Sequence, residues 1–425
     1  MSSPPALSAT SAPPVSASSA RSEPLRTSRE RLVWSAGVIA AVIAGGAAVL
    51  VGSALVLGYD LRAYWMAGRH LMTGAPLYPG PSDLLGLPGE FRYPPLVAVP
   101  FMVLAPLPFD IARWPWLAVQ VAAVVGIALV CLRPLPRAAR PWAVAGLVFF
   151  LPLVLEVTLG NLNLITCALC VAAWRWRDRA PVGGALLAAA LGLKLLPLSL
   201  LVFYLASGRW RMVAWAAALG FASVALTALV MPDRLVEYLR FIPRLREHDW
   251  LFRAIDRTEP AALAAVFWSD IFPNALALGV LALTFAAGRA ARAGGERATT
   301  LHAVALAIVP YLAPFGYFWT TFLVVTIPLF ADTLRRALAL RTRRARFAAV
   351  AVVALAWGLM EFQQLHDLVP ILAHLVSVLL LVGTALVLLA RPAEVIRTPS
   401  GTSIGRDLLV RSGRDAPAGP LPRAR

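Results

Sequence analysis

Long apolar runs separated by short polar connections make up most of this chain. About 20 apolar residues suffice to span a bilayer as a helix, and the first run extends over about residues 32–57. Others follow at about 111–131, 141–158, 163–174, 181–207, 212–230, 263–287, 300–314, 318–331, 347–361 and 369–390. The pattern predicts an all-α polytopic integral membrane protein with about 11 to 13 transmembrane helices.

The two ends of the chain differ from the rest. Residues 1–31 are rich in Ser, Pro and Ala, and residues 391–425 are polar with several Gly and Pro. Both compositions predict disorder, and we expect both ends in the cytoplasm. The transmembrane domain is expected at 32–390. Its first run begins too far from the N-terminus for a signal peptide and is interpreted as a retained anchor.

Composition and charge refine this topology. Hydrophobic residues make up 59% of the 425 residues, which is too many for a soluble domain. The formal net charge of +17 comes from arginines between the apolar runs, a distribution typical of cytoplasmic loops and not of a nucleic-acid-binding surface. With these loops inside, the polar segments at about 58–95 and 231–260 are external. The clusters lie at about 133–140, 175–179, 209–211, 289–297 and 335–346.

One apolar run cannot be a straight helix under this topology, because residues 181–207 connect two arginine clusters that both belong inside. We predict a hairpin or broken pair that turns near Lys194 and Pro197, since proline lacks the amide hydrogen of a continuous helix. Broken helices are tolerated in membranes where they line a cavity. A shorter run, 96–107, cannot span alone and is expected to be re-entrant or interfacial.

Asp60 opens the first external segment and is the first candidate for chemistry. The residues after it, including Tyr64 and Trp65, allow a short interfacial helix. A carboxylate beside a low-dielectric surface can act as a general base. The alternative is structural, since Asp is also a good N-cap for a helix over Leu61–Leu71.

Lys194 is the only lysine of the chain, and it lies within an apolar run. A cation at such a position costs roughly 2.5–3.5 kcal/mol on insertion scales, and charged side chains in membranes usually have a function. At the predicted turn its amine would reach the outer headgroups and could bind a lipid phosphate. The alternative is a lysine that extends to the interface without a partner.

Further polar side chains are predicted on the same face. Glu156, Asn161 and Asn163 lie in LEVTLGNLNL, where they could bind sugar hydroxyls or complete a tight turn. Arg92 and Tyr93 precede two prolines, which impose an extended backbone and so fix the direction of these side chains.

The second external segment and a later aromatic stretch complete this set with His248, beside Asp249, and with Trp319. Two adjacent loop residues are a poor ligand set, so we expect no metal. The chain also lacks a Walker motif, a Rossmann glycine fingerprint, HExxH and a nucleophile elbow. No nucleotide cofactor is expected, and any donor has to arrive through the membrane or the outer aqueous phase.

Taken in order, these motifs resemble those of family 87 glycosyltransferases, which belong to the C-type superfamily of polyprenyl-phosphate-sugar-dependent enzymes. The resemblance covers about residues 33–330 and implies a C-type bundle whose external loops carry the site. The motifs are Asp60 after the first span, Gly74–Tyr78, Phe91–Pro95 (FRYPP), Gly160–Asn163, Leu191–Leu198 (LGLKLLPL) and Gly208–Arg211 (GRWR).

The resemblance implies an inverting transfer of mannose, or of a related pentose such as arabinofuranose, from a polyprenyl-phosphate carrier. The acceptor would be a lipid-linked or cell-envelope glycan on the external face of the plasma membrane, and no nucleic acid takes part. Asp60 would be the general base, and Lys194, matching the lysine of the family's KxxP signature, would bind the donor phosphate. Arg62 and Arg92 are expected to assist Lys194. The expected sugar and acceptor contacts are Tyr64, Tyr93, Asn161, Asn163, His248 and Trp319.

Two motifs depart from the family pattern. The turn that usually reads G-Q-x-N is Gly160-Asn161-Leu162-Asn163, and a later S-P-x-x-W-x-H-H segment appears as Ala313–Trp319 without histidine. Both leave the sugar and the acceptor open. The alternative from another class is a lipid or solute transporter, which would require access from both sides of the membrane.

Overall fold

The computed structural model describes residues 57–78, 91–195, 197–247, 272–312, 320–360 and 368–390. These residues are helical and contain no β-strand, which confirms the predicted all-α class. The predicted disordered ends, and the first apolar run apart from Leu57, lie outside the described residues. The elements are α2 (Tyr59–Thr73), η1 (Pro95–Val103), α3 (Phe109–Cys131), α4 (Arg140–Phe149), α5 (Leu151–Leu159), α6 (Asn163–Arg175), α7 (Ala180–Leu193), α8 (Leu198–Ala206), α9 (Trp210–Val230), α10 (Pro232–Glu247), α13 (Phe272–Ala291), α14 (Gly295–Ala307), η3 (Val309–Leu312), η5 (Thr320–Thr326), α15 (Ile327–Leu338), α16 (Arg343–Met360) and α17 (Leu368–Ala390).

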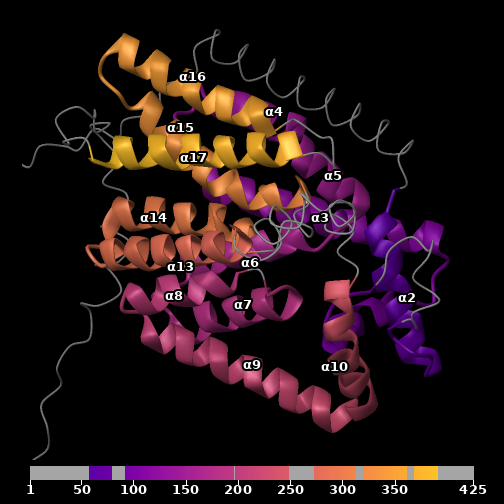
Figure 1. Cartoon of the computed structure of the whole chain (residues 1–425). Coiled ribbons are helices and arrows are strands. Elements are labelled where there is room, and N and C mark those ends of the chain that lie inside the picture. The colour runs from indigo at the N-terminus through magenta and orange to yellow at the C-terminus, as the bar shows by residue number, and fades with distance from the viewer. Residues whose placement is uncertain are drawn as a thin grey trace, which may run out of the picture.

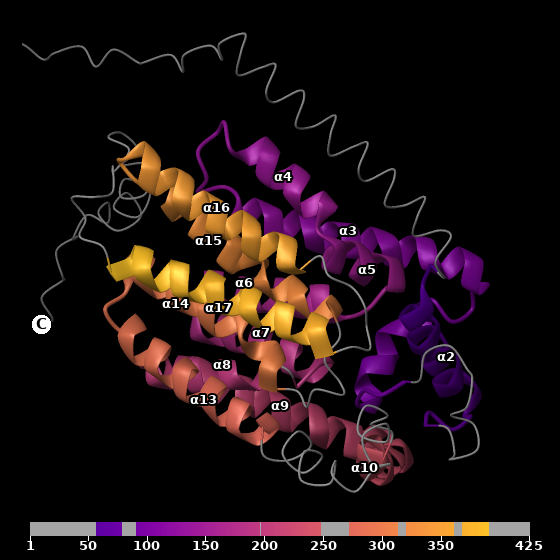
Figure 2. The ribbon, with the colours of Figure 1, turned by 45° about the horizontal axis from the view of Figure 1, so that its top comes forward.

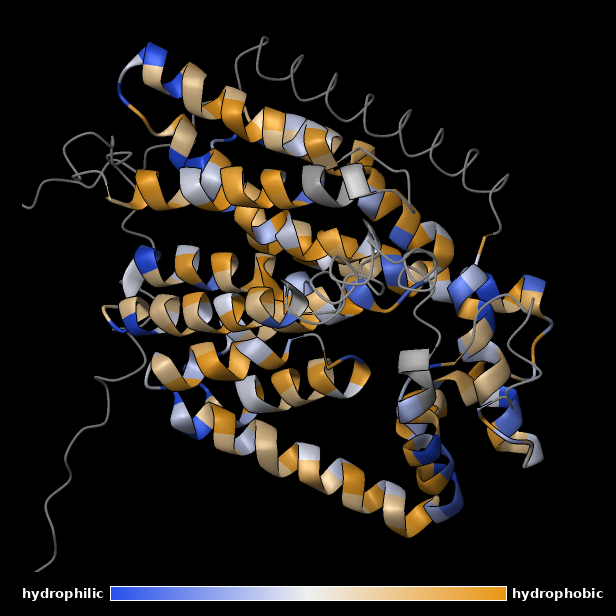
Figure 3. Ribbon diagram, in the orientation of Figure 1, coloured by the Kyte–Doolittle hydropathy of each residue, from blue (hydrophilic) through white to orange (hydrophobic). Residues whose placement is uncertain are grey.

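Three helices in the described part of the chain are long and apolar enough to cross a membrane, namely α3, α9 and most of α13. The pair α4 and α5 would make a fourth span, bent by 56° close to Pro152, whose ring interrupts the hydrogen-bond ladder. Only 11% of the apolar part of α3 or of α9 is buried within the protein, as expected for lipid-facing helices. Apolar residues cover much of the bundle in Figure 3. Several other expected runs, among them 163–174 and 181–207, form shorter helices, so the number of 11 to 13 crossings stays a prediction.

The predicted break in the run 181–207 is confirmed. Helix α7 ends at Leu193 and α8 begins at Leu198. Lys194 between them has an extended backbone, with φ −154° and ψ 130°. Since Pro197 cannot donate an amide hydrogen, the chain leaves the helix before it, and the break brings Lys194 to a helix end.

The arginine-rich connections meet at one end of the bundle, and α2 and α10 lie across the other end (Figures 1 and 2). Helix α3 begins beside α2, where Arg62 lies over the Phe109 ring, and rises about 33 Å to its far end at 1.5 Å per residue. Polar contacts join the loops there: Arg209 to the Arg177 carbonyl (3.1 Å), Arg292 to the Ala206 carbonyl (2.7 Å) and Arg335 to Glu296 (3.1 Å). The prediction that these clusters share one side is confirmed for these connections.

The run 96–107 forms the short 3₁₀ helix η1, which packs against α2. Gly68 permits this contact, because a Cβ there would lie 2.6 Å from the backbone carbonyl of Phe101. Trp65 of α2 holds the residues that follow η1 by donating its indole N–H to the Leu104 and Leu107 carbonyls, each at 3.1 Å. Together, α2 and η1 form one packed unit at this end of the bundle.

Candidate active site

Two glycines join the start of α2 to the turn between α5 and α6. The Gly58 amide donates to the Thr158 carbonyl at 2.7 Å. Gly160 ends α5 with φ 74°, in the left-handed region that favours glycine. A Cβ on Gly160 would lie 3.0 Å from the Cβ of Leu61, so glycine also allows the close approach. The first turn of α2 therefore lies against the turn that carries the two asparagines.

Asp60 lies in the first turn of α2 but does not cap the helix. Gly58 occupies the N-cap position without a side-chain hydrogen bond, and Asp60 Oδ2 accepts a hydrogen bond of 2.7 Å from Asn161 Nδ2. The capping interpretation is therefore wrong. Burial raises the pKa of the Asp60 carboxyl above its ordinary value, while the Asn161 hydrogen bond and the charges of Lys194 and Arg92 oppose this rise. A carboxyl with a raised pKa is a stronger proton acceptor when ionised.

Asn161 is held so that its amide donor points at Asp60. Its Oδ1 accepts a hydrogen bond of 2.6 Å from the backbone N–H of Leu162, which leaves the NH₂ group on the opposite side. The backbone carbonyl of Asn161 accepts a hydrogen bond of 2.5 Å from Gln120 Nε2 on α3. The turn therefore orients Asp60 instead of leaving its carboxylate free to rotate.

Lys194 lies on the same side as Asp60, close enough for their charges to interact. Its Nζ donates to Asn163 Oδ1 at 2.6 Å. The amine also lies 4.2 Å from the centroid of the Phe322 ring and 5.9 Å from that of Tyr93, distances that permit cation–π attraction. The residue is half-buried, and these contacts fix the position of the amine. The alternative of an interfacial lysine without a partner is wrong.

Three tyrosines lie beside Asp60 and Lys194 and bond one another. The hydroxyls of Tyr64 and Tyr93 lie 3.1 Å apart and share a hydrogen bond, and the Tyr78 hydroxyl donates to the Tyr93 carbonyl at 2.6 Å. These bonds hold the FRYPP segment against α2. That the two prolines fix the direction of its side chains stays a prediction. Tyr64 is only 2% exposed, whereas Tyr93 is half-buried.

Helix α10 binds the end of the first external segment, at residues 74–78. The Leu77 amide donates to Glu237 Oε2 at 3.1 Å, and Arg234 bonds both Glu237 and the Gly74 carbonyl. The Tyr78 ring stacks on Phe241 with 4.9 Å between centroids. The two segments predicted to be external are therefore in direct contact, although they are far apart in the sequence.

The sequence matches the model of glycosyltransferase family 87 over residues 91–314, which is more than half of the chain. The chain belongs to glycosyltransferase family 87. The matched region contains Tyr93, Asn161, Asn163 and Lys194, whereas Asp60 precedes it. Membership of this family favours a membrane glycosyltransferase over the transporter alternative.

This family 87 chain is also similar to a curated enzyme of Mycolicibacterium smegmatis. That protein is a polyprenol-phosphate-mannose-dependent alpha-(1-2)-phosphatidylinositol pentamannoside mannosyltransferase, and 159 aligned residues are 32% identical. The alignment covers 36% of this chain and 38% of the relative, so it spans well under half of either protein. No solved structure matches the chain.

Four of the predicted site residues lie away from Asp60 and Lys194 or outside the described residues. Arg62 is exposed and lies over the Phe109 ring at 5.9 Å, on the α3 side of α2. Arg92 is exposed, but its charge acts on Asp60 and Tyr93. His248 and Trp319 lie outside the described residues.

Several contributors were not predicted. Gln120 is fully buried on α3 and supports the Asn161 turn, and Trp116 donates to the Gly160 carbonyl at 2.8 Å. A lone glutamine within an apolar run is a sequence signal that could have revealed Gln120. The hydrogen bond from the Leu77 amide to Glu237 could not be predicted in this way, because single acidic residues are common in amphipathic helices.

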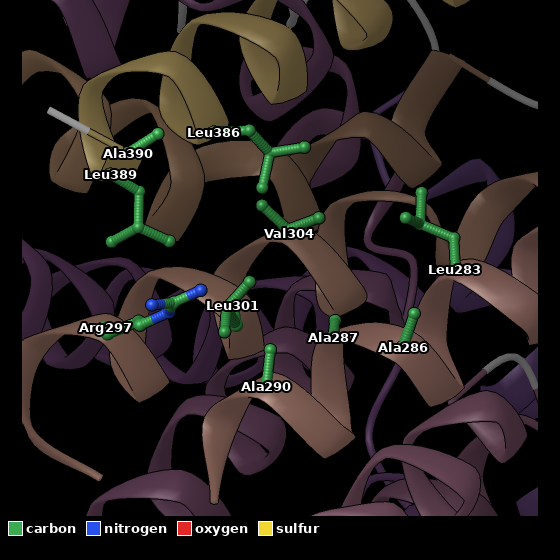
Figure 4. A pocket seen from close by; sticks show the side chains of 10 residues that line it. All are labelled: Leu283, Ala286, Ala287, Ala290, Arg297, Leu301, Val304, Leu386, Leu389 and Ala390. Atoms are coloured by element: carbon green, nitrogen blue, oxygen red, sulfur yellow. The ribbon is translucent and has the colours of Figure 1, made fainter. Parts of the chain in front are cut away.

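A cavity of about 240 Å³ lies far from this cluster, between α13, α14 and the end of α17. The residues around it are Ala, Leu and Val except for Arg297 (Figure 4). It contains no carboxylate and lies towards the arginine-rich end of the bundle. It therefore lacks the carboxylate that the expected reaction needs, and the surroundings of Asp60 and Lys194 are the candidate active site of this family 87 chain.

Proposed function

We propose that this enzyme transfers mannose from a polyprenyl-phosphate carrier to a lipid-linked or cell-envelope glycan. The observation that carries the proposal is the proximity of half-buried Asp60 to half-buried Lys194, with the Tyr93 ring beside the lysine. The similarity to a polyprenol-phosphate-mannose-dependent enzyme supports the donor and the sugar. Arabinofuranosyl transfer would use the same groups, but no contact among the described residues favours it.

In the proposed reaction, Asp60 accepts the proton of an acceptor hydroxyl as that oxygen attacks the anomeric carbon of the donor sugar. The bond from this carbon to the phosphate oxygen breaks in the same step, and polyprenyl phosphate leaves. A single displacement inverts the anomeric configuration and needs one carboxylate as base. Lys194 stabilises the charge that develops on the phosphate. The donor already carries its leaving group, so we propose that no further cofactor takes part.

Transfer with the purified protein tests the donor. We expect incorporation of mannose into a glycolipid acceptor from polyprenyl-phosphate mannose, and none from a sugar nucleotide, because Lys194 is proposed to bind a lipid-linked phosphate and the sequence has no nucleotide-binding motif. Labelled products separated by chromatography provide the measurement. Transfer from a polyprenyl-phosphate pentose alone would replace mannose by arabinofuranose. Transfer from the nucleotide alone would reject the proposal.

We further propose that the site opens on the external face of the plasma membrane. The arginine-rich loops lie at the opposite end of the bundle (Figure 1), and positively charged loops favour the cytoplasm. The contact between the segments 58–78 and 232–241 supports one common external surface.

A pair of cysteine variants tests this orientation. Leu195, beside Lys194, is 65% exposed, and Ala293 is exposed in the turn between α13 and α14. A membrane-impermeant maleimide added to intact cells should label Leu195→Cys, and should label Ala293→Cys only after the membrane is opened. The unmodified protein measures the background from its three native cysteines. The reverse labelling pattern would place the site on the cytoplasmic face.

A further inference from the structure

A fully buried carboxylate, that of Glu156, is linked to Lys194 through Asn163. Glu156 on α5 is 0% exposed. Its Oε1 accepts a hydrogen bond of 2.9 Å from the Leu164 amide, and its Oε2 accepts one of 2.9 Å from Asn163 Nδ2. The side chain is closed off from any substrate, so a role in the reaction has to pass through its neighbours.

Asn163 connects this carboxylate to the lysine. Its Nδ2 donates to Glu156 and to the Thr321 hydroxyl at 3.2 Å, and its Oδ1 accepts from Lys194. An amide has one donor end and one acceptor end; the carboxylate requires the donor and the ammonium requires the acceptor. The orientation of Asn163 is therefore determined by these two charges. With 1% exposure and both ends of its amide bonded, Asn163 has no free group for the sugar contact that its motif suggested.

We propose that Glu156 and Asn163 are positioning residues that keep the Lys194 amine charged and directed at the donor phosphate. This inference rests on the proposed function for the role of Lys194. An ammonium has three N–H donors, and the bridge to Asn163 uses one of them, so two remain for phosphate oxygens. The Phe322 ring, 4.2 Å from the amine, supports the positive charge from another side.

The charges of Glu156 and Lys194 depend on each other. An isolated carboxylate is expensive to bury, and so is an isolated ammonium, but a pair linked by hydrogen bonds is tolerated. The carboxylates that act on Lys194 are Glu156 and Asp60, and of these Asp60 is needed as the base in the proposed reaction. Glu156 thus compensates the lysine without using the catalytic carboxylate.

The chain offers a direct measurement, since Lys194 is its only lysine. Neutral amines react with acylating reagents and ammonium ions do not. In Glu156→Gln, which preserves shape and removes the charge, acylation of Lys194 at fixed neutral pH should be about tenfold faster or more, the factor that corresponds to one pKa unit. The donor KM should rise about tenfold while kcat changes much less, as expected when binding and not the chemical step is affected.

A double variant supplies the rescue. In Glu156→Gln with Asn163→Asp, the new amide can donate to the new carboxylate, which in turn accepts from Lys194, so the charge moves one position along the same chain of hydrogen bonds. We expect slow acylation and a donor KM close to that of the unmodified protein. Thr166→Val is the matched control: Thr166 is a buried residue of α6 that bonds only the Leu162 carbonyl among the described residues, and both quantities should stay unchanged.

Unchanged acylation and donor KM in Glu156→Gln, or a double variant no better than the single one, would overturn the proposal. If the single variant does not fold, the double variant still decides by the same two values. Acylation is measured without substrate, so it tests the effect of Glu156 on the amine even if the donor is not the one proposed. Failure of the proposed function would show instead as normal transfer by a protein that lacks the Asp60 carboxylate.

Discussion

Replacing Asp60 with Asn is expected to lower the rate of sugar transfer by about 10²–10⁴-fold, the usual contribution of a general base. Asn has nearly the same shape and can still contact Asn161, but it cannot accept a proton from the acceptor. Stability should change little, because the substitution removes a charge from a half-buried position. Initial rates with polyprenyl-phosphate mannose and thermal unfolding of the purified proteins provide the two measurements.

Asp110→Asn is the matched control for this substitution. Asp110 also lies in the first turn of a helix at the same end of the protein, but its side chain is 82% exposed and lies 3.6 Å from Arg113. We expect this variant to transfer sugar at a normal rate. Normal turnover by Asp60→Asn would remove the general-base assignment.

The same assignment determines how transfer depends on pH. A base works only when ionised, so the rate should fall as the pH decreases through the pKa of Asp60, which burial raises above 3.8. The Asn161 hydrogen bond favours the ionised form and lowers this pKa. Asn161→Ala should therefore move the acid limb of the rate profile to higher pH. An acid limb at an unchanged pH would show that another group controls it.

Replacing Lys194 with Met is the second change with a large expected effect. Loss of a charge-assisted hydrogen bond to the donor phosphate, worth about 1.5–3 kcal/mol, should lower kcat/KM for the donor by roughly 10- to 100-fold. Glu156 would also lose its compensating charge, and breaking a buried pair on one side costs about 3–5 kcal/mol of unfolding free energy. Steady-state kinetics and denaturant unfolding in detergent measure the two effects.

A second substitution separates these two effects. Glu156→Gln combined with Lys194→Met removes both charges, so stability should return towards that of the unmodified protein while donor binding stays weak. A Lys194→Met protein with a normal donor KM would exclude Lys194 from the phosphate site. A double variant that regains donor binding would show that only the fold had been affected.

Much of the architecture could be predicted from local pattern. Apolar runs predicted an all-α membrane protein. Pro197 predicted the break between α7 and α8, because a missing amide hydrogen interrupts a helix independently of its tertiary contacts. Asp60 and Lys194 were recognisable as candidates because a charged residue beside or within apolar sequence is costly and therefore conspicuous.

Long-range contacts account for what the pattern missed. Gln120 and Thr321 are distant in sequence from the turn that they support, and the cap interpretation of Asp60 failed because Asn161 lies against the same carboxylate in space. The number of membrane crossings stays a prediction, since bends and breaks divide several runs into shorter helices.

For this protein, the sequence by itself determined the helical class, the common side of the arginine loops and the residues whose charge needs an explanation. Only the tertiary structure decided which of these charges belong together: Asp60 with Asn161, and Glu156 with Lys194 through Asn163. The physical reason is that hydropathy and proline act locally along the chain, whereas a buried charge is stabilised by whichever partner the fold brings within hydrogen-bonding distance.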